Sequence, residues 1–304
     1  MTFVNNDSVT SAHSPADAPG VRRAGRPTVD FLNPPGEPAL IAADSVTWRV
    51  FKNPIATYIG GVTAVILELG EPRVRSGVWD HSTFRGDPLR RLRRTGLAAL
   101  VTVYGARSVA EQMIVGVRRL HDRVQGVSDD HRNYRANDPE LLNWVQATAS
   151  FGFVEAYSEF VRRLSPNELN RFYAESEASA RLYGAVGAPR SQADLDAQFA
   201  AARPQLRRSD VILEFLRTME STPVFPAGLG AFQRMLVRAS VSIVPAWARQ
   251  ILGLGPEWDL QRWQAWLVRS AARIMDRFPL PGSAAAQACQ RLGLPRRYLY
   301  QSSN

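Results

Sequence analysis

The chain has 304 residues, of which 45% are hydrophobic and 21% charged, a composition that suits a globular protein with one large domain or two small ones. Its one cysteine, Cys289, excludes a disulfide framework and a cysteine-ligated zinc site, permits a reducing compartment, and leads us to expect a cytoplasmic protein. The formal net charge is +9, but the arginines that carry it are spread along many predicted helices, so we interpret them as solvated helix surface and expect no nucleic-acid partner.

Residues 1–43 are rich in proline, serine, asparagine and glycine, which predicts a flexible or loosely docked N-terminal arm. Arg22 and Arg23 resemble the start of a twin-arginine signal, but charged residues interrupt the stretch that follows, so we reject an export signal. The longest uncharged run, 53–67, is too short and too mixed in character to span a bilayer. We therefore expect no transmembrane segment.

From residue 44 onward, apolar residues recur with helical periodicity, and this pattern predicts one all-α domain of many helices over 44–304. The stretch 54–69 begins with a proline and is apolar nearly all round, so it should be a central helix. Gly60 and Gly61 within it would allow close approach of a neighbouring helix or of a flat ligand. Further helices are predicted over 71–84 (running into a loop), 87–105, 107–126, 138–164, 165–184, 191–206, 209–220, 227–241, 245–252, 259–277 and 283–292, with a loop over 127–137.

Several of these helices carry end signals. Asp87 precedes a proline and predicts an N-cap, and Ser165 followed three residues later by Glu168 predicts a capping box. For the helix over 107–126 we expect Ser108 as the cap and Gly126 as the stop.

One histidine lies on the apolar face of the helix predicted over 107–126. Met113, Val117, His121 and Val124 follow one another at i, i+4, i+8 and i+11, so they share a face and His121 should point inward. A lone buried histidine is most often a core residue that has found a hydrogen bond, but neutral imidazole is also the commonest metal ligand among side chains. The residues alone leave both interpretations open.

The chain lacks the short motifs of several enzyme classes. It has no phosphate-binding loop, no dinucleotide-binding glycine motif after a strand, no nucleophile elbow, and no Glu-x-x-His pair for a di-iron bundle. It contains four histidines in all, His13, His81, His121 and His131, which leaves little for a multi-histidine metal site.

Three stretches together carry a resemblance to a known family. They are GVWDHSTFRGDPLRRLRRTG (77–96), RRLHDRVQG (118–126) and YRANDPELLNWVQAT (134–148). In this order and spacing the chain resembles the MpaB-type oxygenase family, which includes the catalytic domain of the bacterial rubber oxygenase. The resemblance covers about 45–300 and is strongest over 60–150.

The resemblance implies an all-α fold that encloses one b-type haem, with His121 at the position of the histidine that binds the haem iron. On the opposite side of the iron the rubber oxygenase carries an Arg-x-x-Lys-Thr motif, which Arg91, Arg94 and Thr95 match here except at the lysine. Arginine remains protonated in proteins, so Arg94 should not bind iron. It would instead hydrogen-bond dioxygen or pair with a haem propionate, unless it is solvated helix surface. We expect Arg91 to contact the haem and, with Thr95, to polarise dioxygen.

These features lead to one main function hypothesis and two alternatives. The main hypothesis is a haem b-dependent oxygenase that uses dioxygen to oxidise a small apolar substrate, such as an isoprenoid or other alkene. The first alternative is a haem-binding sensor, carrier or scavenger of the same fold without oxygenase turnover. The second is a haem-free, basic helical protein that binds nucleic acid, which rests on the net charge and the arginines over 90–94 alone.

Overall fold

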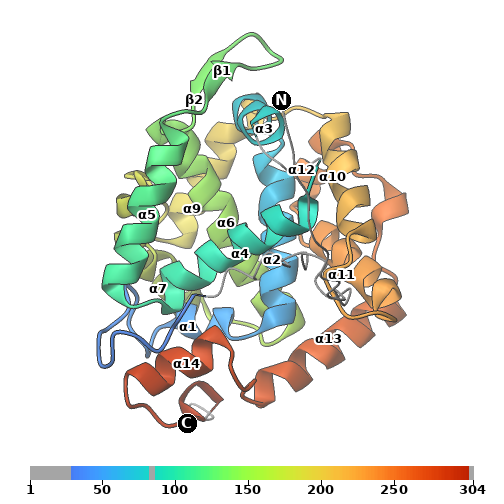
Figure 1. Cartoon of the computed structure of the whole chain (residues 1–304). Helices are drawn as coiled ribbons and strands as arrows, with labels where there is room; N and C mark the ends of the chain where they lie inside the picture. Colours follow the sequence, from blue (N-terminus) through green and yellow to red (C-terminus); the bar gives the residue numbers. More distant parts are fainter. Residues whose placement is uncertain (1–28, 82–85, 301–304) are drawn as a thin grey trace, which may run out of the picture.

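The computed structural model describes residues 29–81 and 86–300, and within them almost all regular structure is helical (Figure 1). The α-helices are α1 (Val46–Phe51), α2 (Pro54–Glu68), α3 (Pro72–Asp80), α4 (Pro88–Tyr104), α5 (Arg107–His121), α6 (Pro139–Phe160), α7 (Pro166–Glu175), α8 (Glu177–Tyr183), α9 (Gln192–Ala202), α10 (Asp210–Ser221), α11 (Gly230–Ser242), α12 (Ala246–Leu252), α13 (Arg262–Arg277) and α14 (Ala284–Arg291). Two short strands, β1 (Gln125–Val127) and β2 (Asn133–Arg135), form an antiparallel hairpin. The expectation of an all-α fold is confirmed.

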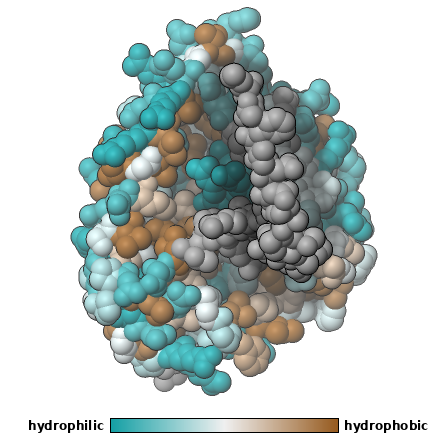
Figure 2. All heavy atoms as spheres, in the orientation of Figure 1, coloured by the Kyte–Doolittle hydropathy of each residue, from teal (hydrophilic) through white to brown (hydrophobic). Residues whose placement is uncertain are grey.

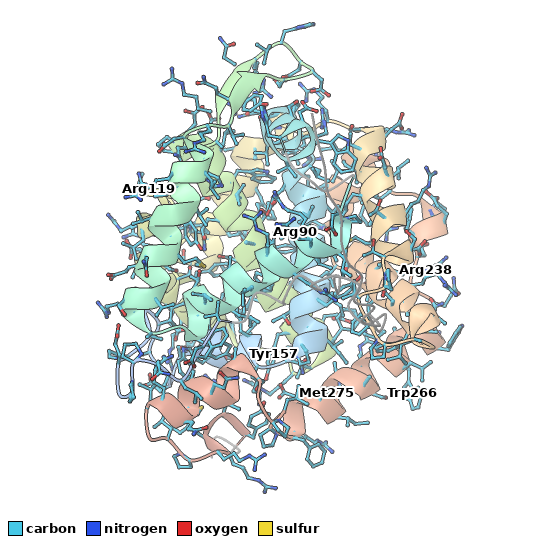
Figure 3. All side chains as sticks on the ribbon, in the orientation of Figure 1. Arg90, Arg119, Tyr157, Arg238, Trp266 and Met275 are labelled. Carbon is cyan, nitrogen blue, oxygen red and sulfur yellow. The ribbon has the colours of Figure 1, made fainter. Side chains whose placement is uncertain are left out.

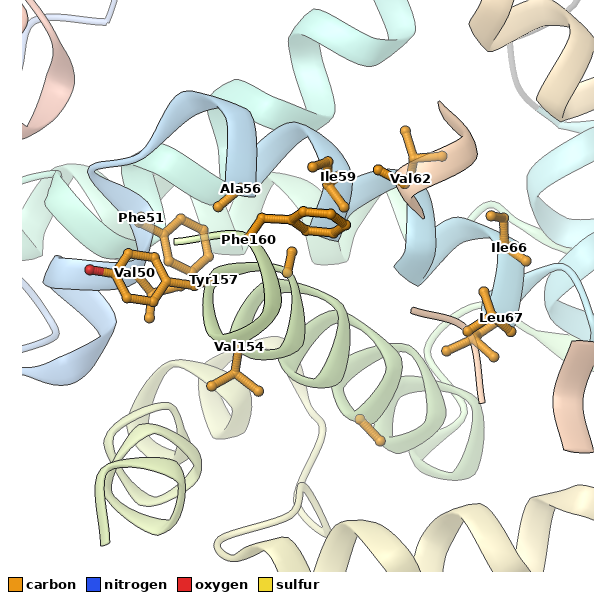
Figure 4. Packing of buried hydrophobic residues seen from close by; sticks show 14 of the residues in the cluster. Val50, Phe51, Ala56, Ile59, Val62, Ile66, Leu67, Val154, Tyr157 and Phe160 are labelled. Atoms are coloured by element: carbon orange, nitrogen blue, oxygen red, sulfur yellow. The ribbon is translucent and has the colours of Figure 1, made fainter. Parts of the chain in front are cut away.

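Helix α2 is the centre of the molecule, as its apolar sequence predicts. Ile59 and Ile66 on α2 have no exposed surface, and they belong with Val154 and Phe160 of α6 to one apolar core (Figure 4). The two helices approach so closely at Gly60 that a Cβ atom there would lie 2.7 Å from the carbonyl oxygen of Gly152 on α6. Gly60 therefore allows the close approach of a neighbouring helix, which is one of the two roles that the sequence predicted for it.

The predicted helix ends at Asp87 and Ser165 are both confirmed. The Asp87 side chain accepts a hydrogen bond from the Arg90 backbone N–H at 3.0 Å, and Ser165 and Glu168 form the reciprocal bonds of a capping box. Arg162 donates two hydrogen bonds to the Glu168 carboxylate, and together with the cap this lowers the pKa of Glu168 to about 2.

The helix predicted over 107–126 is shorter than expected, because α5 ends at His121 and the chain turns into the hairpin. The segment expected to be a loop over 127–137 supplies β2, and the Ser128 hydroxyl stabilises the turn by donating to the Asp130 carboxylate and accepting from the Arg132 backbone N–H. Ser108 does not cap α5. Its backbone N–H and hydroxyl bond the Glu37 carboxylate instead, at 2.6 and 2.9 Å.

Residues 29–43, which the sequence assigns to a flexible arm, are held against the domain. Phe31 and Ile41 are buried in the core. The buried Arg291 guanidinium on α14 donates to the carbonyl oxygens of Phe31 and Glu37, at 2.8 and 2.9 Å. Apolar burial and these charge-assisted bonds fix this part of the arm, whereas 1–28 lie outside the described residues.

None of the described helices combines the length and apolar character needed to cross a membrane.

Candidate functional site

Helix α4 crosses the front of the molecule and passes in front of α2 (Figure 1). Figure 2 shows a hollow with hydrophilic residues in this region, and Figure 3 labels Arg90 there. Arg90 and Arg93 are exposed, as solvated helix surface should be. Of the three residues predicted on α4 to face a haem, Arg91 is half-buried, while Arg94 and Thr95 are exposed and bond no other described side chain.

Arg91 faces a carboxylate that the sequence analysis missed. Glu68 is the last residue of α2, and its carboxylate has no hydrogen-bond or ion-pair partner within 29–81 and 86–300. Burial raises the pKa of Glu68 to about 7, while the charge of Arg91 opposes the shift. Burial also lowers the pKa of Arg91, with Glu68 opposing and the charge of Arg94 adding to the effect. The one available signal was a carboxylate that interrupts an otherwise apolar helix, VTAVILELG (62–70).

His121 ends α5 and is half-buried. Its Nδ1 atom is fully buried and has no hydrogen-bond partner among the described residues. Burial lowers the pKa of His121, the charge of Arg91 lowers it further, and the Asn137 amide and Asp122 oppose these effects. The fold thus places His121 and Arg91, predicted from separate motifs, within electrostatic reach of each other.

Asn137 is a second group that the sequence analysis did not select. Its Nδ2 donates to the Arg118 carbonyl at 3.0 Å and to the Asp122 carboxylate at 2.7 Å, and because both are acceptors the orientation of the amide is fixed. The remaining Oδ1 is buried and has no partner in the described part of the chain. Asn137 raises the pKa of His121, which is the effect of an acceptor beside an imidazole.

The hairpin explains why Asn137 lies beside His121. Gln125 pairs with Arg135, and the ladder continues with a 2.9 Å bond from the Ala136 N–H to the Val124 carbonyl. The residue after Ala136 therefore returns to the C-terminal end of α5, directly before α6 begins. Sequence could not indicate this, since it requires the pairing register as well as the hairpin.

His121 lines a polar cavity. The cavity of about 280 Å³ is formed by His121, Asp122, Gln125, Arg135, Asn137 and Asp138. Helices α4 and α5 also carry half-buried apolar side chains, namely Leu92, Leu97, Leu100, Met113 and Val117. The haem enclosure expected from the resemblance stays a prediction.

The two other described histidines lie elsewhere. His81, at the end of α3, is exposed and its ring nitrogen lies 3.1 Å from the Tyr134 hydroxyl. His131 is exposed at the hairpin turn with a φ of 63°. No group of three or more His, Cys, Asp or Glu side chains is placed to bind a metal ion in the described ranges. A haem iron has different needs, because the porphyrin supplies four nitrogen ligands and the protein adds axial side chains.

Residues 48–277 match the family model described as ER-bound oxygenase mpaB/B'/Rubber oxygenase, catalytic domain. No curated protein and no solved structure gives a significant match to the chain.

Proposed function

The chain belongs to the family of mpaB and rubber oxygenase catalytic domains, and on this premise we propose that it is a haem b-dependent oxygenase that acts with dioxygen on a small apolar substrate, such as an isoprenoid or other alkene. The observation that supports the proposal is that half-buried Arg91 lies within electrostatic reach of both the half-buried His121 and the half-buried carboxylate of Glu68. An oxygenase catalytic domain is what the family description states, and the cofactor and substrate are our proposal.

The donor set fits one haem. His121 would bind the iron through Nε2, since Nδ1 is buried and lies beside the Asn137 amide. The half-buried apolar side chains of α4 and α5 would contact the porphyrin faces, and Arg91 would pair with a propionate or donate to an oxygen atom of the ligand. When bound, haem supplies the activation of dioxygen.

The charged side chains of this region have two different roles in the proposed reaction: the arginines bind oxygen atoms, and Glu68 exchanges a proton. Arg91 and Arg94 keep their positive charge at all relevant pH values, so they can bind and orient anionic or polar oxygen but cannot take up a proton. Glu68 can, because its pKa of about 7 lets the carboxyl hold or release a proton near neutrality. We assign Glu68 the role of proton acceptor and donor, with Thr95 and Arg94 at the exposed rim.

We propose that Asn137 orients His121. Its fixed Oδ1 would accept the proton of His121 Nδ1 and so leave Nε2 free for iron, since the hydrogen bond that one ring nitrogen makes decides the state of the other. Asn137→Ala should reduce the share of apo-protein in which His121 carries its proton on Nδ1, which 15N chemical shifts of the imidazole measure. The same substitution should weaken haem binding about 10- to 100-fold.

A second asparagine controls the orientation experiment. Asn133→Ala removes an exposed asparagine of the same hairpin and should change neither readout. An apo-protein whose neutral His121 carries its proton on Nε2 would contradict the role of Asn137, whether or not the chain binds haem.

The raised pKa of Glu68 makes a separate prediction for the stability of the apo-protein. Near pH 4 the carboxyl is protonated in both the folded and the unfolded chain, so it has no differential effect. Above pH 7 the folded chain must hold a half-buried carboxylate without a partner among the described residues, and Glu68→Gln should then raise the free energy of unfolding by about 1–3 kcal/mol. Urea unfolding at pH 4.5, 6 and 8 measures the difference. The exposed Glu111→Gln on α5 should show no such pH dependence, and a Glu68→Gln difference that is constant with pH would contradict the prediction.

The function is tested by the visible spectrum and oxygen uptake of protein produced with excess haem precursor. We expect a Soret band, a b-type pyridine haemochrome, and oxygen uptake that rises with squalene but not with squalane, its saturated analogue. A chain that takes up no haem contradicts the proposal. A chain that binds haem without uptake on any alkene would be a haem-binding protein without oxygenase turnover.

A further inference from the structure

Helix α13 exposes an apolar face. Half of the ten most exposed large hydrophobic side chains of the described residues lie on it or directly after it. They are Trp263, Trp266, Leu267, Ile274 and Phe278, and the exposed fraction reaches 65% at Trp266. In Figure 3 Trp266 lies at the outer edge of α13, away from the other helices. A cluster of this kind marks an interaction site, because monomeric proteins rarely leave several large side chains exposed together.

The helix is firmly anchored through its other face. Val268 and Ala272 have no exposed surface and pack into the core. Asp276 pairs with Lys52 at 3.2 Å, and the Asn53 side chain donates to the Ala272 carbonyl at 2.8 Å. The exposed residues thus lie on a fixed helix, whose orientation the fold determines.

The charge beside the apolar face is mostly positive, and the exception is the exposed Glu159 of α6, which is paired with Arg269 of α13. Arg262, Arg273 and Arg277 follow at i, i+11 and i+15 and border the apolar side chains on the exposed half of the helix. The one acidic residue of α13, Asp276, is half-buried and bonded to Lys52. The exposed face therefore combines aromatic and aliphatic side chains with uncompensated arginines.

The combination of exposed apolar side chains and arginines favours an anionic bilayer over a second copy of the chain as the partner of α13. A second copy of the chain, paired about a two-fold axis along α13, would bring two rows of arginines together, and both carboxylates at this helix, Asp276 and Glu159, are already paired within the chain. A bilayer with anionic lipids instead accepts tryptophan at the headgroup level and arginine at the phosphates, and the apolar side chains enter the acyl boundary.

We propose that α13 docks the protein on the surface of a bilayer that contains anionic lipids. The helix lies on the membrane and does not span it, with Trp263, Trp266 and Ile274 in the interface. This inference goes beyond the oxygenase proposal and does not depend on it.

Vesicle flotation tests the proposal with the full chain. We expect the protein to float with vesicles of 70% phosphatidylcholine and 30% phosphatidylserine and to bind pure phosphatidylcholine at least tenfold more weakly. Trp263→Ser/Trp266→Ser should weaken binding to the anionic vesicles tenfold or more, and Arg262→Gln/Arg277→Gln by about fivefold for each arginine. Circular dichroism melting checks that each variant is folded.

Matched controls separate this face from the overall positive charge. Arg118→Gln/Arg119→Gln changes the net charge equally on the exposed face of α5 and should bind like the parent. Equal loss in both arginine pairs would overturn the proposal in favour of diffuse attraction. Absence of binding to either vesicle would also overturn it, as would a dimer in light scattering that the tryptophan pair disrupts while vesicle binding is unchanged.

Discussion

Replacing His121 with alanine is expected to remove the Soret band from purified protein while the helical content stays unchanged. The reason is that we propose His121 as the iron ligand, and this half-buried histidine lies within electrostatic reach of Arg91 on α4. If His121 binds the iron as proposed, its loss should weaken haem binding at least 100-fold, because loss of a group that only supports a metal ligand already costs 10- to 100-fold. Haem titration of the apo-protein, followed by absorbance, measures the change.

A second histidine provides the control for this experiment. His131 is exposed at the hairpin turn with a φ of 63°, a conformation that asparagine also tolerates, so His131→Asn removes an imidazole at little structural cost. It should leave the haem spectrum and affinity unchanged. Haem bound with parental affinity and an unchanged spectrum in His121→Ala would assign the ligand to another residue.

Local sequence signals predicted the helices of this chain better than they predicted its site. Asp87 and Ser165 define helix starts because a cap depends on residues only a few positions apart. The apolar stretch that begins at Pro54 predicted a buried helix for the same reason. The hairpin was missed because 125–135 lacks the alternating apolar pattern and the two-residue glycine turn that indicate one.

The residues of the candidate site also divide into those that local sequence signals indicate and those that only the folded structure reveals. His121 and Arg91 followed from a periodic face and from a family resemblance, so both were available in the sequence. Glu68 and Asn137 were not, because each matters only through a tertiary neighbour: Glu68 through the passage of α4 over the end of α2, and Asn137 through the hairpin register. Neither residue type stands out where it occurs. Buried unpartnered atoms and a raised pKa distinguish them, and both are properties of the folded chain.

Replacing Gly152 with alanine is expected to lower the free energy of unfolding by about 2–4 kcal/mol, although alanine is the better helix former by about 1 kcal/mol. A Cβ atom at Gly152 would meet backbone atoms of α2, the Gly60 carbonyl and, at 3.1 Å, the Ala64 nitrogen. Backbone in the middle of a buried helix cannot move aside as a flexible side chain can. The two helices would have to separate, which opens the apolar layer between them.

Two glycines serve as matched controls in urea unfolding. A Cβ atom at Gly116, on the exposed face of α5, would have no described neighbour within 4 Å, so Gly116→Ala should stabilise the protein by about 0.5–1 kcal/mol through helix propensity alone. Gly61→Ala should be tolerated, since the nearest contact of its Cβ atom would be the Phe153 ring at 3.8 Å. If Gly152→Ala is as stable as the parent, α2 and α6 do not meet as closely as the structure places them.

Gly152→Ala also tests whether the contact between α2 and α6 positions the candidate site. Glu68 ends α2, and Asn137 stands two residues before α6, so a shift between the two helices changes the separation of groups that we assign to one site. Gly152→Ala should therefore weaken haem binding more than its stability loss alone explains, when affinity is measured without urea at a temperature where the variant is fully folded. Gly61→Ala should not, because it leaves the contact between Gly60 and Gly152 intact. Parental haem affinity in a folded Gly152→Ala variant would show that the α2–α6 contact stabilises the protein without positioning its site.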